Sequence, residues 1–251
     1  MKYKLIVGNW KMNPVTLDEA KRILKSVRRV ATELKSTKVV VCPPFNYIPA
    51  ALSAKKSEVI VGAQNVFPEN QGSFTGEIGP LMLKNMGVEY VIVGHSERRK
   101  MGETDEDVAK KIRALIEENI QPILCVGEAE HDQGGLYLDI LKNQIKNSLA
   151  KVQKKYANSI IIAYEPIWAI GAKESMDPKI ILEMGIFIKK VLSDIFGHDE
   201  AMSTPILYGG SVNFRNASDI ISLGKVDGLL VGRESVNAPG FVELLKTVDS
   251  I

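Results

Sequence analysis

Short runs of apolar, often β-branched residues alternate with longer amphipathic segments along the whole chain. Such runs are typical of strands buried on both faces, and we expect strands at residues 4–10, 39–42, 59–63, 90–93, 123–126, 160–164, 206–208 and 228–231. The longer segments carry an apolar stripe opposite a face rich in Lys and Glu, and they include expected helices at residues 17–34, 106–118, 137–155 and 178–196. This alternation indicates parallel strands joined by helical crossovers.

Eight strand–helix units within 251 residues favour a closed barrel over an open sheet. No G-x-G-x-x-G motif follows the first strand, which weighs against a dinucleotide-binding sheet. The chain has no low-complexity tract and no linker rich in Pro, Gly or Ser. The sequence therefore predicts an α/β protein with a single (β/α)8 barrel, in one domain that covers residues 1–251.

The composition limits the class of partner. A net charge of +2, with 45% hydrophobic and 25% charged residues, is ordinary for a soluble protein and favours neither nucleic acid nor an anionic membrane. No apolar stretch is long enough to span a bilayer, and the first residues lack the apolar region of a signal peptide, so we expect a cytoplasmic protein. Cys42 and Cys125 each end an apolar run, which favours buried free thiols. The histidines are too widely spaced to predict a metal site.

Residues suited to chemistry follow five of the predicted strands. In a barrel the carboxyl ends of the strands meet at one face, where barrel enzymes place their active sites. These residues are Asn9 and Lys11, His95, Glu165, Gly209 to Ser211, and Gly232 with Arg233. We therefore treat this face as the candidate site.

Glu165 stands where the run 160–164 gives way to a loop that begins with Pro166. Partial burial would raise the pKa of its carboxyl group, which suits a general base near neutral pH. A solvated glutamate at a loop entrance is the ordinary alternative, and this segment alone does not decide between them. Trp168 and Ile170 are large apolar residues in the loop, and they fit a segment that packs over a ligand.

Lys11 and His95 also have ordinary alternatives, a solvated lysine and a histidine at the surface or in the core. In a barrel mouth the Lys11 ammonium would instead stabilise developing negative charge, with Asn9 holding it or the ligand. Ser96 and Glu97 look like the start of a helical turn, whose partial positive charge would keep the His95 imidazole neutral. Glu97 is then a candidate partner of Lys11.

Glycines follow both of the last two predicted strands. Gly209 and Gly210 precede Ser211, and Gly232 precedes Arg233. Turn glycines are common, but backbone N–H groups after these two strands often form the phosphate site of a barrel. Glycines at both strand ends favour a phosphate site.

Together the four segments resemble the triosephosphate isomerase family, and the resemblance runs over residues 4–248. They read G-N-W-K-M-N at 8–13, G-H-S-E-R-R at 94–99, A-Y-E-P-I-W-A-I-G at 163–171 and Y-G-G-S at 208–211. The resemblance implies an isomerase that interconverts dihydroxyacetone phosphate and D-glyceraldehyde 3-phosphate through an enediolate, with no metal or organic cofactor. A glutamate base working with a neutral histidine is already described for this family.

Carried onto this chain, the resemblance implies three catalytic residues. Glu165 would take the proton next to the carbonyl, neutral His95 would polarise the carbonyl and move protons between the oxygens, and Lys11 would stabilise the enediolate. The implied substrate-binding residues are Asn9, Trp10, Lys11, Gly171, Ser211, Gly232 and Arg233, with Ser96 and Glu97 behind them. The implied lid consists of Pro166, Ile167, Trp168, Ala169, Ile170 and Gly171.

The resemblance also implies a homodimer. The segment 64–80 is similar to the family's interdigitating loop, from which Thr75 would reach the partner's active site, with Glu77 and Arg98 also at the interface. A flexible surface excursion is the alternative, but Phe67 and Phe74 favour a loop that something covers.

Three departures from the family pattern keep alternatives open. The residues after Gly171 read A-K-E-S-M, where the family usually has T-G-K, and Arg233 replaces a second glycine. The segment after Glu128 is also unlike the usual pattern. Two rival functions are therefore considered: another phosphate-binding barrel enzyme such as a sugar-phosphate epimerase, and a catalytically weakened barrel that binds a phosphate metabolite as a scaffold.

Overall fold

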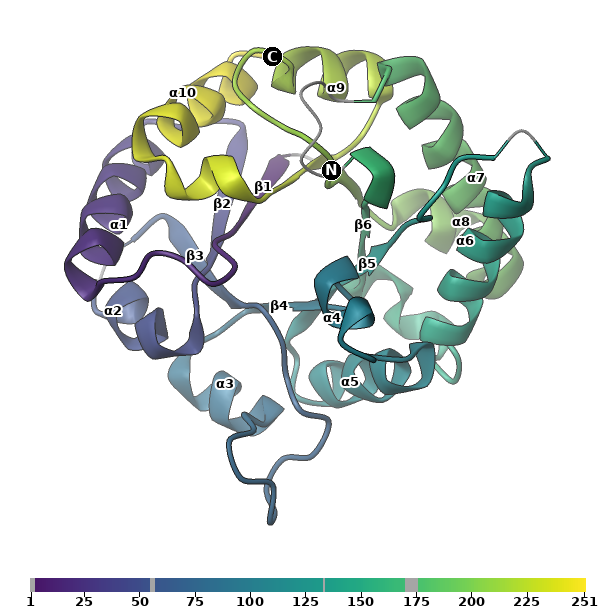
Figure 1. Cartoon of the computed structure of the whole chain (residues 1–251), viewed down its shortest axis with the longest axis horizontal. Helices are drawn as coiled ribbons and strands as arrows, with labels where there is room; N and C mark the ends of the chain where they lie inside the picture. The colour runs from purple at the N-terminus through teal and green to yellow at the C-terminus, as the bar shows by residue number, and fades with distance from the viewer. Residues whose placement is uncertain (1–2, 55–56, 133, 170–175) are drawn as a thin grey trace.

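The computed structural model describes residues 3–54, 57–132, 134–169 and 176–251. Within these residues, eight parallel strands close into a barrel in the order β1 to β8, and helices surround it (Figure 1). β1 pairs with both β2 and β8, which completes the ring. The predicted (β/α)8 barrel is confirmed.

The strands lie where the apolar runs predict them, to within two residues at each end. Their bounds are β1 (Lys4–Asn9), β2 (Thr37–Cys42), β3 (Val59–Ala63), β4 (Tyr90–Val93), β5 (Gln121–Val126), β6 (Ile161–Tyr164), β7 (Ile206–Tyr208) and β8 (Gly228–Val231).

The helices vary more in length than the strands. The α-helices are α1 (Leu17–Ala31), α2 (Ile48–Leu52), α3 (Pro80–Met86), α4 (Ser96–Lys100), α5 (Asp105–Glu117), α6 (Leu136–Ser148), α7 (Pro178–Phe196), α8 (His198–Ser203), α9 (Ala217–Gly224) and α10 (Ala238–Asp249). Short 3-10 turns are η1 (Phe45–Tyr47), η2 (Lys154–Ser159), η3 (Ile167–Ala169) and η4 (Arg233–Val236).

The helix predicted at 137–155 was too long. It ends at Ser148, and Lys151 adopts a left-handed backbone with φ of 69°, which an α-helix cannot contain. The helix predicted at 17–34 likewise ends earlier, at Ala31. The start of the helix predicted at 178–196 is fixed by Asp177, whose side chain accepts the N–H of Lys179.

Two apolar layers fill the molecule because strand side chains alternate between the two faces of the barrel wall. Alternate residues of the strands point inward, and Leu5, Val7 and Val40 belong to this inner cluster. Residues between them, such as Ile6, pack outward against the helices. Cys42 and Cys125 lie in the inner cluster as buried free thiols, as predicted.

In the described part of the chain, no helix combines the length and apolar character needed to cross a membrane.

Candidate active site

Glu165 and His95 meet at the carboxyl ends of β6 and β4. Glu165 Oε1 lies 3.2 Å from His95 Nε2, and the two side chains are only 4% and 6% exposed. The Glu165 N–H donates to the carbonyl of Val126 at 2.8 Å, which continues the β5–β6 pairing to the point where the side chain enters the site. The predicted burial of this carboxylate is confirmed.

Hydrogen bonds fix where the imidazole of His95 carries its proton. His95 is the N-cap of α4, and its Nδ1 accepts the backbone N–H of Glu97 at 3.1 Å. A nitrogen that accepts a hydrogen bond bears no proton, so the proton of the neutral ring lies on Nε2, the nitrogen that is 3.2 Å from Glu165 Oε1. This is the helical turn that the sequence predicts at Ser96 and Glu97.

Burial and the neighbouring carboxylates shift the pKa of His95 in opposite directions. Burial lowers the pKa of His95, whereas the carboxylates of Glu165 and Glu97 raise it, and the net direction is upward. The positive charge of Lys11 lowers the pKa of His95 and partly offsets that rise. The contact with Glu165 therefore favours the imidazolium, while the Glu97 N–H at Nδ1 favours the neutral ring.

Lys11 is held in an unusual backbone conformation beside this pair. Its φ of 54° is left-handed, which is uncommon for a residue with a side chain. The side chain of Gln64 donates to the carbonyl of Lys11 at 2.9 Å, and Asn9 Oδ1 accepts its N–H at 3.1 Å. Its ammonium group lies 2.6 Å from Glu97 Oε1, so the predicted Lys11–Glu97 partnership is confirmed.

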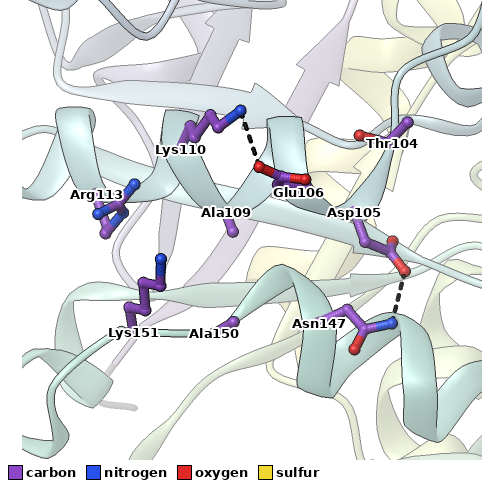
Figure 2. Close-up of a pocket in the computed structure, with 9 residues that line it drawn as sticks. All are labelled: Thr104, Asp105, Glu106, Ala109, Lys110, Arg113, Asn147, Ala150 and Lys151. Carbon is purple, nitrogen blue, oxygen red and sulfur yellow. Dashed lines mark hydrogen bonds and ion pairs between the residues drawn. The ribbon is translucent and has the colours of Figure 1, made fainter.

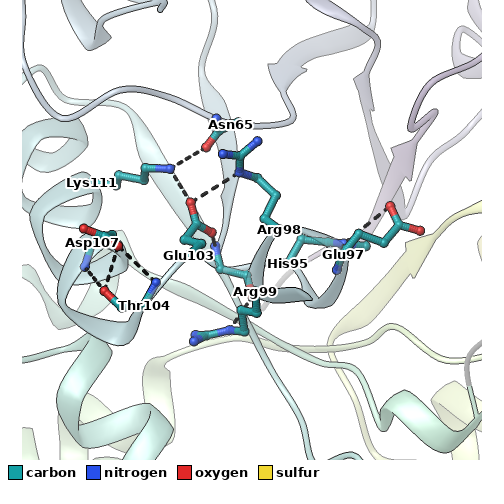
Figure 3. A network of polar contacts seen from close by, with 10 residues as sticks. Asn65, His95, Glu97, Arg98, Arg99, Glu103, Thr104, Asp107 and Lys111 are labelled. Carbon is teal, nitrogen blue, oxygen red and sulfur yellow. Dashed lines mark hydrogen bonds and ion pairs between the residues drawn. The ribbon is translucent and has the colours of Figure 1, made fainter. Parts of the chain in front are cut away.

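A network from several elements fixes the residue before His95 (Figure 3). Glu103 accepts the N–H of Gly94 at 3.1 Å, and Arg99 Nε donates to the carbonyl of Gly94 at 2.7 Å. Glu103 also accepts from Arg98 and from Lys111. The N–H and the carbonyl of Gly94 are therefore both held by hydrogen bonds. These bonds set the direction in which the chain continues from β4 into His95.

Two glycines make room for Glu165. A Cβ on Gly209 would lie 2.6 Å from Glu165 Cγ, and one on Gly127 would lie 1.9 Å from the carbonyl oxygen of Glu165. Contacts this short do not occur for real side chains, so both positions require glycine because the Glu165 segment passes so closely.

The ends of β7 and β8 offer backbone groups rather than side chains. Among the described residues, the N–H groups of Gly232 and Arg233 make no hydrogen bond. A Cβ on Gly232 would lie 3.3 Å from Lys11 Cε, which places this turn beside the lysine. Ser235 Oγ bonds the carbonyls of Asn9 and Gly232, so it ties β1 to the β8 turn. Ser211, at the end of β7, accepts from Asn216 through its carbonyl.

A comparison with known protein families matches residues 4–248 to the family described as Triosephosphate isomerase. The chain belongs to this family. Curated relatives named "Triosephosphate isomerase" include those of Fusobacterium nucleatum, at 40% identity over 98% of this chain and 99% of the relative, and Dehalococcoides mccartyi, at 42% over 98% and 97%. The relative from Chloroherpeton thalassium is 37% identical over 99% of this chain and its own full length.

The lid that the family resemblance implies is described only in its first part. Pro166 and Ala169 are buried, Ile167 is half-buried, and Trp168 is 43% exposed. Ile170, Gly171 and the departure at 172–175 lie outside the described residues. At the far side of the lid, the Tyr208 hydroxyl accepts the N–H of Met176 at 3.2 Å.

Trp10 is a predicted substrate-binding residue whose side chain lies away from the site. Its indole is 1% exposed and packs in the cluster between strands and helices. Strand alternation explains this, because Asn9 points to the mouth and the next residue must point outward. The indole is therefore a packing element, which differs from the prediction.

Arg233 has a backbone conformation at this turn that residues other than glycine can adopt. It begins η4 and has no positive φ, so a side chain is tolerated there without strain. The departure from the family's glycine leaves the backbone N–H in place.

The predicted interface residues come from two parts of the chain, the segment between β3 and α3 and the helix α4. Thr75 and Glu77 are exposed on the segment between β3 and α3, which projects away from the barrel (Figure 1). Arg98 lies beside a pocket of about 300 Å³ that is also lined by Lys11 and His95.

Another pocket, of about 400 Å³, lies between α5 and α6 on the outside of the barrel (Figure 2). Two pairs of its lining groups interact with each other: Lys110 with Glu106 at 3.0 Å, and Asn147 with Asp105 at 3.4 Å. None of the predicted site residues lines this pocket.

Sequence reasoning missed the residues that hold the site in place. Gln64 and Ser235 each bind a backbone carbonyl of β1 or its loop, and Glu103 holds Gly94. The signal available for Gln64 was its position directly after the predicted strand 59–63. Nothing local marks Ser235 as a partner of Asn9, because the closed barrel brings these two residues together. Glu103 lies nine residues after Gly94, at the other end of α4.

Proposed function

We propose that this chain interconverts dihydroxyacetone phosphate and D-glyceraldehyde 3-phosphate by proton transfer, with Glu165 as base and neutral His95 as the group that polarises the carbonyl. The observation that carries the proposal is the buried contact of 3.2 Å between Glu165 Oε1 and His95 Nε2. Membership of the triosephosphate isomerase family supplies the reaction.

The chemistry needs a base beside a hydrogen-bond donor. The Glu165 carboxylate removes a proton from the carbon next to the carbonyl, and the Nε2–H of His95 donates to the carbonyl oxygen as negative charge develops there. The N–H of Glu97 at Nδ1 keeps that nitrogen a hydrogen-bond acceptor, so His95 can lose and regain its Nε2 proton between the two oxygens of the enediolate.

Lys11 supplies the positive charge that an enediolate and a phosphate dianion require. Its ammonium group sits between Glu97 and the Gly232 turn, so one cation faces both the reacting carbons and the phosphate. The N–H groups of Gly232 and Arg233, which have no hydrogen-bond partner in the described part of the chain, support a phosphate site at the end of β8, with Ser211 at the end of β7.

A homodimer completes the proposal. Large apolar side chains are exposed near the mouth and on the projecting segment, among them Met12 at 92%, Met101 at 72% and Phe74 at 44%. Such side chains favour an interface with a second copy. Thr75 of that copy would enter the pocket lined by Asn9 and Lys11.

Two further expectations belong to the same proposal. Residues 1–251 form one folding unit, which is supported by the pairing of the first strand with the last. The protein acts in the cytoplasm, which is supported by two free, buried thiols in the barrel interior. A single unfolding transition observed with two independent probes would check the first of these.

The test is a coupled assay of the purified chain with D-glyceraldehyde 3-phosphate, beside Glu165→Asp, together with light scattering to determine the mass. We expect fast isomerisation, a loss of roughly 10²-fold in the variant because the base is withdrawn by about 1 Å, and a dimer mass. Turnover that is unchanged in Glu165→Asp would remove Glu165 from the role of base. A folded wild-type protein without turnover would favour the scaffold alternative.

A further inference from the structure

His131 joins a cluster at the base of the lid that the proposed mechanism does not use. Its ring centroid lies 3.8 Å from that of Tyr137 at an interplanar angle of 31°, and 5.9 Å from that of Trp168 at 63°. His131 belongs to the segment after Glu128 that departs from the family's usual pattern.

Glu128 is the charge at the centre of this cluster. Its side chain is fully buried, and Oε1 accepts both the Tyr164 hydroxyl and Trp168 Nε1–H at 2.9 Å. Among the described residues, Oε2 has no hydrogen-bond partner. A buried carboxylate with one oxygen unsatisfied is unfavourable, and a nearby positive charge would compensate it.

His131 is placed to supply that charge. Its Nδ1 lies 3.7 Å from Glu128 Oε1, and its side chain is 31% exposed, so the ring can exchange protons with water. Protonation would pair the imidazolium with Glu128 and would strengthen its contact with the ring of Tyr137.

The other charged groups that act on the cluster from the described residues are carboxylates. Asp132 is occupied at the start of α6, where it accepts the N–H groups of Leu136 and Tyr137. Burial and the charges of Glu128, Glu183 on α7 and Asp132 together raise the pKa of Tyr137, so its hydroxyl stays protonated near neutral pH. The described surroundings of His131 are therefore acidic.

Trp168 connects this cluster to the catalytic base. It lies three residues after Glu165, within η3, whose first residue Ile167 donates its N–H to the carbonyl of Glu128 at 2.9 Å. Whatever fixes the indole of Trp168 also fixes the short segment through which the chain leaves Glu165.

We propose that His131 is a positioning residue, which holds the Trp168 indole against Glu128 and does so more strongly when its imidazole is protonated. The inference deepens the proposed function, because the segment held in this way leads directly from the proposed base. The interaction itself requires neither substrate nor turnover.

Intrinsic fluorescence of the unliganded protein between pH 5 and pH 8 tests the proposal. A protonated imidazole quenches a nearby indole, so we expect Trp168 emission to fall as the pH is lowered. The chain has two tryptophans, and Trp168→Phe gives the contribution of Trp10 to be subtracted. His131→Phe, which keeps a stacked ring, and His131→Gln, which keeps a polar group, are both expected to lose this transition.

His198→Phe is the matched control because His198 is exposed on α8, outside the cluster. It is expected to keep the transition at the same pH as the wild type. A transition that persists in both His131 variants, or is absent from the wild type, would overturn the inference. Assaying the same proteins separates the two proposals: a His131-dependent transition in a protein without turnover would refute the proposed function and leave this inference standing.

Discussion

Asp249 and Glu165 are two carboxylates at opposite ends of the barrel, and they differ in how many hydrogen-bond donors the protein supplies to them. Asp249, at the end of α10, accepts the N–H groups of Lys35 and Ser36 and the Ser36 hydroxyl, just before β2 begins. Glu165 contacts His95 through one oxygen, and its other oxygen has no hydrogen-bond partner among the described residues.

The two carboxylates have separate roles: Asp249 stabilises the fold, and Glu165 belongs to the proposed catalytic site. At Asp249, beside the amino end of β2, the protein satisfies a carboxylate with its own donors, which stabilises the fold. At the carboxyl ends, Glu165 Oε2 and the N–H groups of Gly232 and Arg233 have no hydrogen-bond partner among the described residues, which costs stability and leaves groups that a substrate can satisfy. The comparison predicts that substitutions at the carboxyl end change turnover and that substitutions at the amino end change the free energy of unfolding.

His95→Gln should produce the largest effect. Glutamine can donate a hydrogen bond to the carbonyl, but it cannot move protons between the two oxygens, so we expect kcat to fall by about 10²- to 10⁴-fold. Steady-state kinetics with both triose phosphates checks this. A fall of less than about tenfold would show that the proton passes through another group.

Gly209→Ala tests whether space, rather than side-chain chemistry, places the base. Its Cβ would lie 2.6 Å from Glu165 Cγ, so Glu165 must move, and we expect kcat to fall by about 10- to 100-fold. Gly185→Ala in α7 is the matched control, because nothing lies within 4 Å of its Cβ. The control should keep full activity and gain up to about 1 kcal/mol of stability. Equal kinetics in the two variants would contradict the account.

Gly232→Ala should have a smaller effect, and mainly on substrate binding. Its Cβ would approach Lys11 Cε to 3.3 Å at the proposed phosphate site, and we expect kcat/KM to fall by about tenfold, or about 1.4 kcal/mol. Arg233→Gly is the companion variant. If only the backbone N–H contacts phosphate, it leaves KM nearly unchanged, and a large rise in KM would assign a role to the Arg233 side chain.

A feature of the fold or of the site could be predicted from the sequence when the residues that form it are close together in the chain. Strand positions and the N-cap Asp177 depend on neighbouring residues, so local pattern is sufficient. The Gln64–Lys11 and Ser235–Asn9 contacts join residues 53 and 226 positions apart in the chain, and no local pattern specifies them. The end of α6 was missed because the left-handed residue there is Lys151, without the glycine that usually marks such a stop.

Asp249→Asn should have the smallest effect, and on stability alone. Burial raises the pKa of Asp249. The hydrogen bonds from Lys35 and Ser36 lower this pKa by more than burial raises it, so the net direction is downward. The carboxylate therefore stabilises the fold fully above the unfolded value of about 3.9, and this contribution is lost as the pH falls through the lower folded value.

We expect Asp249→Asn to reduce the free energy of unfolding by about 1 kcal/mol at pH 7, with kcat unchanged. Urea unfolding at pH 7 and at pH 3 checks this, since the difference between variant and wild type should shrink at the lower pH. A difference that grows on acidification would contradict the assignment.

The most direct test of the central claim, proton transfer by Glu165, is isomerisation in D2O followed by NMR. The account predicts deuterium from the solvent on the product carbon next to the carbonyl, with incorporation and isomerisation both slowed by roughly 10²-fold in Glu165→Asp. Rapid isomerisation without any deuterium incorporation, or incorporation at an unchanged rate in Glu165→Asp, would contradict it.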